Sequence, residues 1–232
     1  MIQIRPKQER GKTNLSWLDS RHTFSFGDYH DPQHMSFGAL RVINEDRVSA
    51  GAGFPTHGHR DMEIVTYVLK GELAHRDSTG TSSVIRAGEV QRMSAGTGIN
   101  HSEFNNSTAG GVHFLQIWIL PERTAITPAY EQRGFGADGK AGKWQLVASR
   151  DGAQGSLTVH QDAKIYLANL NAGATLEFAA QPKRKFWVQI VSGETALNGT
   201  AMAAGDGAAV TDEAKLTFTG SVSSEIMLFD LA

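Results

Sequence analysis

The chain has 232 residues, of which 40% are hydrophobic and 20% charged, and its formal net charge is −2. This composition is typical of a globular protein with one large or two small domains, and the near-neutral charge argues against a general nucleic-acid or membrane binder. The absence of cysteine excludes disulfides and thiolate metal sites. No segment has the apolar length of a signal peptide or a transmembrane helix, so we expect a cytoplasmic protein, and we expect it to be a monomer.

Short apolar runs recur along the chain, separated by glycine turns rather than by a linker. Because no long segment keeps a helical period, this pattern predicts many short strands and an all-β barrel or sandwich. In chain order, the clearest expected strands are residues 39–43, 64–69, 84–86, 112–120, 186–191 and 226–229.

Two short polar motifs interrupt this apolar pattern, His57-Gly58-His59 and His101-Ser102-Glu103. The two-residue spacing places both side chains of a pair on one face of a strand. If the two strands face each other, three imidazoles and one carboxylate meet at one point. This donor set suits a divalent first-row metal and leaves two positions of an octahedral ion open for water or substrate. A single H-x-H is more often a surface or structural pair, but the second motif favours a metal site.

The residues around both motifs resemble the two-part cupin motif. Three features depart from it: the spacing from Glu63 to Gly71 is one residue longer, the spacing from Gly88 to Gly96 is two residues longer, and Gly96 stands in place of a proline. These departures leave open which glutamate binds a metal. The positions that fit are Gly51 to His59 in the first part and Gly98, His101 and Asn105 in the second.

More specifically, the first 135 or so residues resemble the pirin family, in particular its bacterial quercetinase-like members. The resemblance implies an all-β bicupin of two antiparallel β-barrel or jelly-roll domains, with residues 1–135 binding the metal and residues 136–232 lacking a metal site. The matching stretches are residues 20–26, 38–44, 56–63, 93–98, 101–103 and 126–132.

An internal repeat agrees with a bicupin. When Gly71 is aligned with Gly193, residues 63–72 and 185–194 both read as an apolar strand closed by a glycine turn. Two unrelated strands with a common turn would give the same pattern, and we favour duplication because the family resemblance implies it. No histidine follows His160, so the second domain cannot build a site with several histidines. We expect it to stabilise the first domain and to shape its entrance.

The resemblance implies a metal-dependent dioxygenase that cleaves a flavonol such as quercetin with dioxygen and releases carbon monoxide. The implied ligands are His57, His59, His101 and Glu103, and Glu103 is also the expected base for the flavonol 3-hydroxyl. Glu63 would then orient a ligating imidazole. Iron(II) is the first choice of metal, with nickel, cobalt, manganese, copper or zinc as alternatives.

Two other functions are compatible with the same metal site. One is a metal-binding regulatory or interaction protein of the pirin type without catalysis, and the other is a cupin enzyme that acts on a different small molecule. The remaining histidines are expected outside the site: His22, His30 and His34 as hydrogen-bonded structural residues, and His75 as an exposed one. His113 is expected either to support the metal ligands or to pack in the core.

Overall fold

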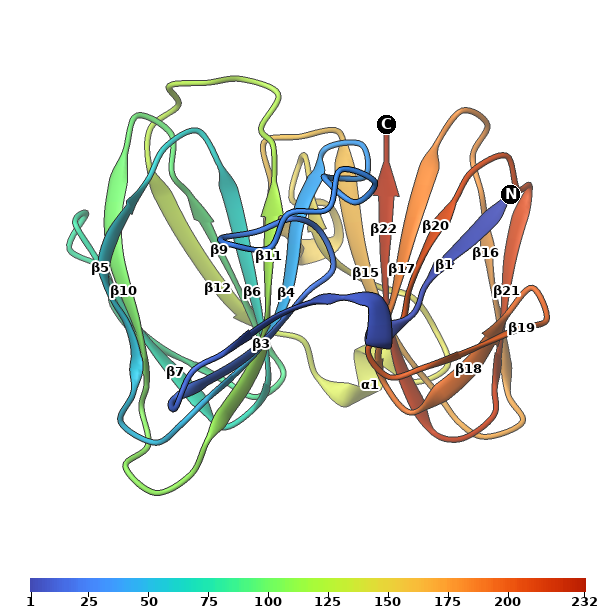
Figure 1. Cartoon of the computed structure of the whole chain (residues 1–232). Helices are drawn as coiled ribbons and strands as arrows, with labels where there is room; N and C mark the ends of the chain where they lie inside the picture. Colours follow the sequence, from blue (N-terminus) through green and yellow to red (C-terminus); the bar gives the residue numbers. More distant parts are fainter. The chain divides into compact units, whose positions relative to one another are not determined.

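The computed structural model describes residues 1–232, and its contacts divide the chain into two compact units (Figure 1). The N-terminal unit comprises Gly11–Gly134 and Leu157–Gln161, and the C-terminal unit comprises Met1–Arg10, Phe135–Ser156 and Asp162–Ala232. The division therefore differs from a single boundary at residue 135. The first residues join the C-terminal unit because strand β1 (Ile2–Arg5) pairs with β20 (Gly207–Val210).

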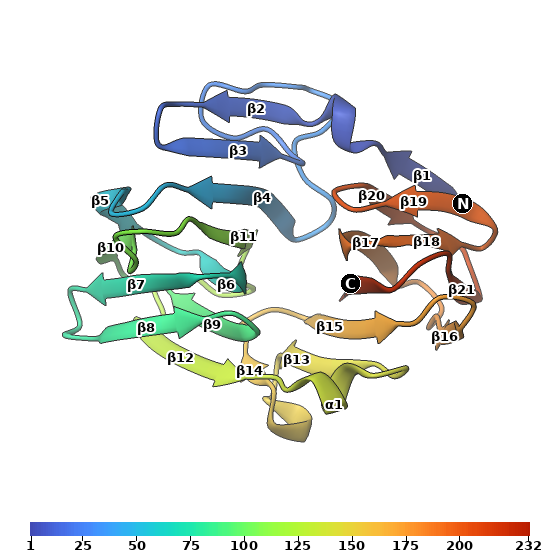
Figure 2. The same cartoon turned by 90° about the horizontal axis from the view of Figure 1, so that it is seen from below.

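The N-terminal unit is built from two antiparallel sheets (Figure 2). The larger has the strand order β12-β9-β6-β11-β4-β3-β2, and the smaller has the order β5-β10-β7-β8. The strands of this unit are β2 (Gly11–Asn14), β3 (Leu18–His22), β4 (Leu40–Val48), β5 (Gly53–His59), β6 (Glu63–Lys70), β7 (Glu72–Asp77), β8 (Ser82–Arg86), β9 (Glu89–Ser94), β10 (Ile99–Asn105), β11 (Val112–Ile119), β12 (Ala129–Gly134) and the short β14 (Leu157–Thr158).

The C-terminal unit repeats this plan. Its larger sheet contains the order β1-β20-β17-β22-β15-β13, and its smaller sheet has the order β16-β21-β18-β19. Besides β1 and β20, its elements are the helix α1 (Ala137–Lys140), the 3-10 turns η1 (Lys7–Glu9) and η2 (Ala153–Gly155), and the strands β13 (Gln145–Ser149), β15 (Ala163–Leu170), β16 (Thr175–Ala179), β17 (Lys185–Ser192), β18 (Glu194–Leu197), β19 (Thr200–Ala203), β21 (Lys215–Gly220) and β22 (Ser224–Leu231).

The shared strand order supports the duplication expected from the sequence. The small sheets correspond strand for strand, and the central strands β9-β6-β11-β4 of one unit correspond to β20-β17-β22-β15 of the other. Gly71 and Gly193 occupy equivalent turns of the two units, with φ of 78° and 72°. Residues other than glycine rarely adopt this backbone conformation. The all-β bicupin expected from the sequence is confirmed, and each of the six predicted runs coincides with a strand except for the end residues Ala39 and Leu120, which lie just outside.

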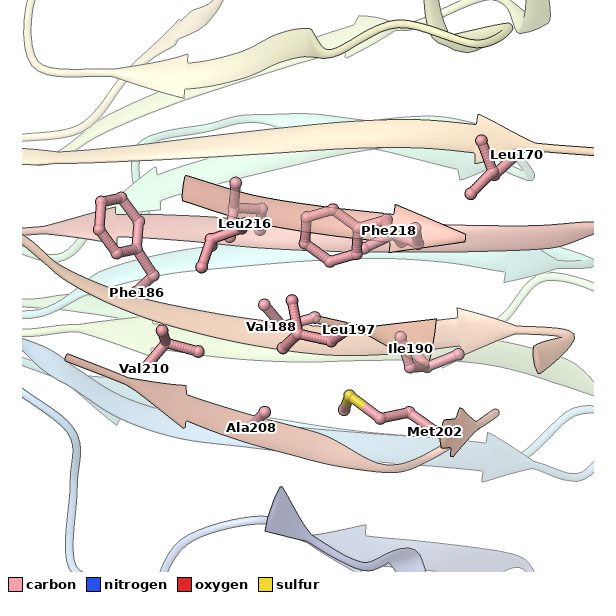
Figure 3. Close-up of a cluster of buried hydrophobic side chains, with 12 residues drawn as sticks. Leu170, Phe186, Val188, Ile190, Leu197, Met202, Ala208, Val210, Leu216 and Phe218 are labelled. Atoms are coloured by element: carbon pink, nitrogen blue, oxygen red, sulfur yellow. The ribbon is translucent and has the colours of Figure 1, made fainter. Parts of the chain in front are cut away.

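The interior of the C-terminal unit is filled with apolar side chains (Figure 3). Phe186, Val188 and Ile190 from β17 meet Leu216 and Phe218 from β21, and all five are buried. Strand alternation explains this packing, because residues two apart point to the same face of a sheet. No helix of the structure is long and apolar enough to cross a membrane.

Candidate metal centre

The small sheet of the N-terminal unit brings both sequence motifs together. Strand β10 lies between β5 and β7, and its register places His101 opposite His57 on one side and opposite Asp77 on the other. Glu103 lies opposite His75 of β7. A register shift between His101 and Glu103 on the β5 side locally interrupts the ladder, and such irregularities often re-aim side chains near functional sites.

Three imidazoles form a compact cluster. One nitrogen each from His57, His59 and His101 lies within 4.8 Å of the others, and the Nε2 atoms of His57 and His101 are 3.0 Å apart. The Nδ1 of His57 donates to the carbonyl oxygen of Pro55 at 2.8 Å. Because a carbonyl only accepts, Nδ1 carries a proton, which leaves Nε2 as the nitrogen of His57 that faces the cluster and can bind a metal.

The surroundings keep two of these imidazoles neutral. Burial, together with the neighbouring His57, lowers the pKa of His59 to about 4. Burial, together with the neighbouring His57 and His59, lowers the pKa of His101 to about 2. Only neutral imidazole binds a metal, so at neutral pH these rings are in the binding form.

The carboxyl group of Glu103 is buried, and one of its oxygens is held in place. Oε2 accepts a hydrogen bond of 2.9 Å from Nε2 of Gln116, and Oε1 of Gln116 accepts one of 2.5 Å from Thr66. The other oxygen, Oε1 of Glu103, has no hydrogen-bond partner. Burial raises the pKa of Glu103 to about 7.

These residues fit a divalent transition-metal ion. An unpartnered buried acceptor costs about 1–3 kcal/mol, and Oε1 of Glu103 is such an atom. The cluster of His57, His59 and His101 adds converging nitrogen donors, and Glu103 lines the same cavity as His57 and His59. A cation would satisfy these lone pairs together, and the mixed nitrogen and oxygen donors suit a first-row metal rather than calcium or magnesium.

Glu63 lies outside this cluster. It is fully buried, and its Oε2 accepts hydrogen bonds from Ser94 at 3.0 Å and from the backbone N–H of His160 at 3.2 Å. The ring of His160 is 3.3 Å from the same oxygen. Glu63 therefore orients His160 and not one of the three clustered imidazoles.

His75 differs from its expected position, because it is fully buried rather than exposed. Its Nε2 donates to Asp77 at 2.9 Å, and its ring lies against that of Tyr130 with centroids 4.9 Å apart. One ligand atom each from His75, His101 and Glu103 lies within 4.8 Å of the others. His75 is buried because β7 pairs with β10. Its position in the sequence, shortly after the Gly71 turn, had indicated an exposed residue.

Two other histidines are also hydrogen-bonded. His113 contacts Glu45 at 3.0 Å and lies in a separate cleft of about 480 Å³ that contains none of the expected ligands. His22 is buried, as a structural histidine should be, and bonds Thr13 at 2.9 Å and Asn44 at 2.8 Å. It nevertheless lines the cavity beside the imidazole cluster.

That cavity has a volume of about 250 Å³. Its aromatic walls include Phe26 and Trp118, which meet edge to face with ring centroids 5.3 Å apart. Trp118 also lies edge to face with His59 at 5.0 Å. The polar wall formed by Ser20, His22, Asn44 and Asp46 was not expected from the sequence, because in β3 and β4 these residues stand among other polar residues and form no distinctive pattern. The residues that line the cavity are Thr13, Leu18, Ser20, His22, Phe26, Gly27, Asp28, Asn44, Asp46, Phe54, His57, His59, Glu103, Gln116 and Trp118.

The fold and this cavity can be compared with known proteins. The family model for pirin matches residues 3–119. The chain belongs to the pirin family. A second model, for the quercetinase C-terminal cupin domain, matches residues 146–231. The resemblance of the sequence to pirins is thereby confirmed.

Relatives of this pirin match it along its whole length. Quercetin 2,3-dioxygenase of Escherichia coli K12 is 49% identical over 231 residues, which cover 100% of this chain and 99% of the relative. The crystal structure of YhhW from Escherichia coli superposes with a TM-score of 0.97 at 48% identity and covers 100% of this chain and 98% of that chain. A crystal structure of bacterial pirin YhhW in complex with nickel(II), also from Escherichia coli, gives 0.95 at 48% identity, with 100% and 99% covered.

Proposed function

We propose that this pirin is a metal-dependent dioxygenase that cleaves a flavonol such as quercetin, with one divalent ion held by His57, His59, His101 and Glu103. The observation that carries the proposal is the cluster of imidazoles beside a buried carboxylate with an unpartnered oxygen, in a cavity with aromatic walls. The name of the Escherichia coli relative supports the substrate class.

The side chains that line the cavity would have different roles in binding and catalysis. The aromatic walls at Phe26, Phe54 and Trp118 would hold the planar rings and exclude water. Glu103 would take the proton of the flavonol 3-hydroxyl, while the hydrogen bond from Gln116 keeps its carboxyl group in place. The bound metal would supply positive charge and redox chemistry.

The overall reaction conserves its atoms. One flavonol and one dioxygen are consumed, and the carbon that bears the 3-hydroxyl leaves as carbon monoxide after both of its ring bonds break. The two oxygen atoms of dioxygen remain in the cleaved product, which is oxidised while dioxygen is reduced. The proton taken by Glu103 returns to the product, so the side chain ends in its starting state.

The donor set supports iron(II) as the metal, since three imidazoles and a carboxylate suit an oxygenase ion with open positions. Nickel is the first alternative, because a relative at 48% identity was crystallised with nickel(II). Cobalt, manganese, copper and zinc share the same donor preferences to a lesser degree.

The test is aerobic incubation with quercetin, following loss of flavonol absorbance, oxygen uptake and carbon monoxide release. Metal-loaded protein should turn over, and chelator-treated protein should not. His57→Ala should lose metal and activity together, whereas His30→Ala, at an exposed histidine, should retain both. Equal rates with and without metal would refute the proposed mechanism. Absence of turnover in every metal form would favour a binding or regulatory protein instead.

A further inference from the structure

One polar wall of the cavity is not used by the proposed metal centre. It comes from β3 and β4, whose register places Ser20 opposite Asp46 and His22 opposite Asn44. Residues two apart on a strand share a face, so these four side chains form two polar pairs on one face of the larger sheet. All four line the cavity that also contains His57 and Glu103.

Most hydrogen-bonding groups of this wall are satisfied within the chain. The Nδ1 of His22 donates to the amide oxygen of Asn44 at 2.8 Å. The other ring nitrogen, Nε2, is hydrogen-bonded to the hydroxyl of Thr13 at 2.9 Å. Both ring nitrogens of His22 are thereby held by partners within the chain, and neither is left for a ligand.

Asp46 is the exception. Only 4% of the residue is exposed, and its Oδ1 accepts a hydrogen bond from the hydroxyl of Ser20. No hydrogen bond within the chain reaches Oδ2, which keeps accessible surface in the cavity that Asp46 lines. A carboxyl group that lines a cavity, with one oxygen held by the chain and the other unpartnered, can accept a hydrogen bond from a ligand in that cavity. The cavity provides the space from which such a donor can come.

The surrounding surface indicates the chemical class of that donor. Phe26 and Trp118 meet edge to face in the same cavity, and Phe54 adds a third aromatic ring. A ligand that satisfies both features is a flat aromatic molecule with a hydroxyl group at its edge. An alkyl or cationic ligand would satisfy only one of them.

We propose that Asp46, positioned by Ser20, is a specificity-determining residue that accepts a hydrogen bond from a ring hydroxyl of the substrate. This inference rests on the proposed flavonol cleavage and names a recognition element within it. It means that the enzyme selects polyhydroxylated flavonols over flavonols that carry only the reacting 3-hydroxyl. When the bound substrate lacks the ring hydroxyl, it covers Oδ2 of Asp46 without providing a donor, which penalises the poorer substrate.

The test compares quercetin with 3-hydroxyflavone, which keeps the reacting group and lacks the other hydroxyls. At pH 8.5, where the Asp46 carboxyl is ionised, we expect kcat/KM of the metal-loaded enzyme to favour quercetin by about 10- to 100-fold, as one charge-assisted hydrogen bond provides. Asp46→Asn replaces the acceptor Oδ2 by a donor and should reduce this preference at least about tenfold, with 3-hydroxyflavone little affected. Ser20→Ala, which frees Oδ1, should reduce the preference less.

A matched control is Asp19→Asn, the same chemical change one position from Ser20, at a residue that lines the other cleft. It should keep the wild-type preference. Metal content and melting temperature of each variant separate recognition from misfolding. The inference is overturned if Asp46→Asn keeps the wild-type preference, or if it slows both substrates equally.

A binding measurement separates this inference from the proposed reaction. Anaerobic calorimetry of metal-loaded protein with each flavonol gives the same preference as a ratio of Kd values, without any turnover. If the wild type cleaves neither flavonol, the proposed function fails. The Kd ratio of Asp46→Asn against wild type would still decide whether Asp46 recognises ring hydroxyls: an unchanged ratio refutes it, and a ratio lowered about tenfold supports it.

Discussion

Replacing Asp46 by Asn should make the metal-free protein more stable at alkaline pH, although it removes a group of the cavity. Burial raises the pKa of Asp46 from 3.8 to about 7, against the opposing hydrogen bond from Ser20. Between these two values the unfolded chain has lost the proton that the folded chain still holds. The unfolded state therefore binds fewer protons, and the free energy of unfolding of the wild type falls as pH rises.

The magnitude follows from the two pKa values. Their difference is about three units, and each unit corresponds to about 1.36 kcal/mol. The full cost of keeping Asp46 in the fold is thus at most about 4 kcal/mol, absent below pH 3.8 and complete above pH 7. Asn has nearly the same shape, can still accept from Ser20 through its amide oxygen, and does not ionise.

The assay is urea unfolding of chelator-treated wild type and Asp46→Asn from pH 4 to 8.5. The variant should match the wild type near pH 4 and exceed it by about 2–4 kcal/mol at pH 8.5. Asp138→Asn, at an exposed aspartate, should show no such trend. A stability difference that is constant across this range, or a wild type that is the more stable protein at pH 8.5, would show that Asp46 does not hold a proton in the fold.

Three further predictions concern the metal. After reconstitution, elemental analysis should find one tightly bound ion per chain, because the C-terminal unit has an apolar interior and no histidine; two equivalents would contradict this. Glu103→Gln should abolish flavonol cleavage and weaken metal retention at least about 10- to 100-fold, whereas Glu63→Gln should keep its metal, and the reverse pattern would overturn the choice of ligand. Metal affinity, measured by chelator competition, should rise about tenfold per pH unit up to pH 7 and then level off, because Glu103 must lose its proton; a flat profile from pH 5.5 to 7 would exclude this coupling.

The stabilising effect predicted for Asp46→Asn and the loss of substrate preference proposed for it have the same cause. A carboxyl group that awaits a donor from the substrate stays unsatisfied in the free protein. Functional groups of this kind commonly lower stability. The pair of measurements therefore tests whether one residue carries both effects.

Much of this molecule could be predicted from local patterns in the sequence. Apolar runs between glycines located six of the strands, since alternation and turn chemistry are local properties. The two-residue spacing of His57 with His59, and of His101 with Glu103, placed each pair on one strand face. Because no histidine follows His160, a site with several histidines could be expected only in the N-terminal unit.

Pairing between distant strands decided the rest. The register of β10 with β5 and β7 brings His101 opposite His57 and buries His75 beside Glu103, and the pairing of β3 with β4 places Asp46 beside Ser20. The first ten residues join the C-terminal unit through the pairing of β1 with β20. Spacing along a strand determines which side chains share a face, but a one-residue change of register reverses which face meets a neighbour. The ligand cluster could thus be predicted as two pairs, while its polar wall and its buried neighbours exist only in the folded chain.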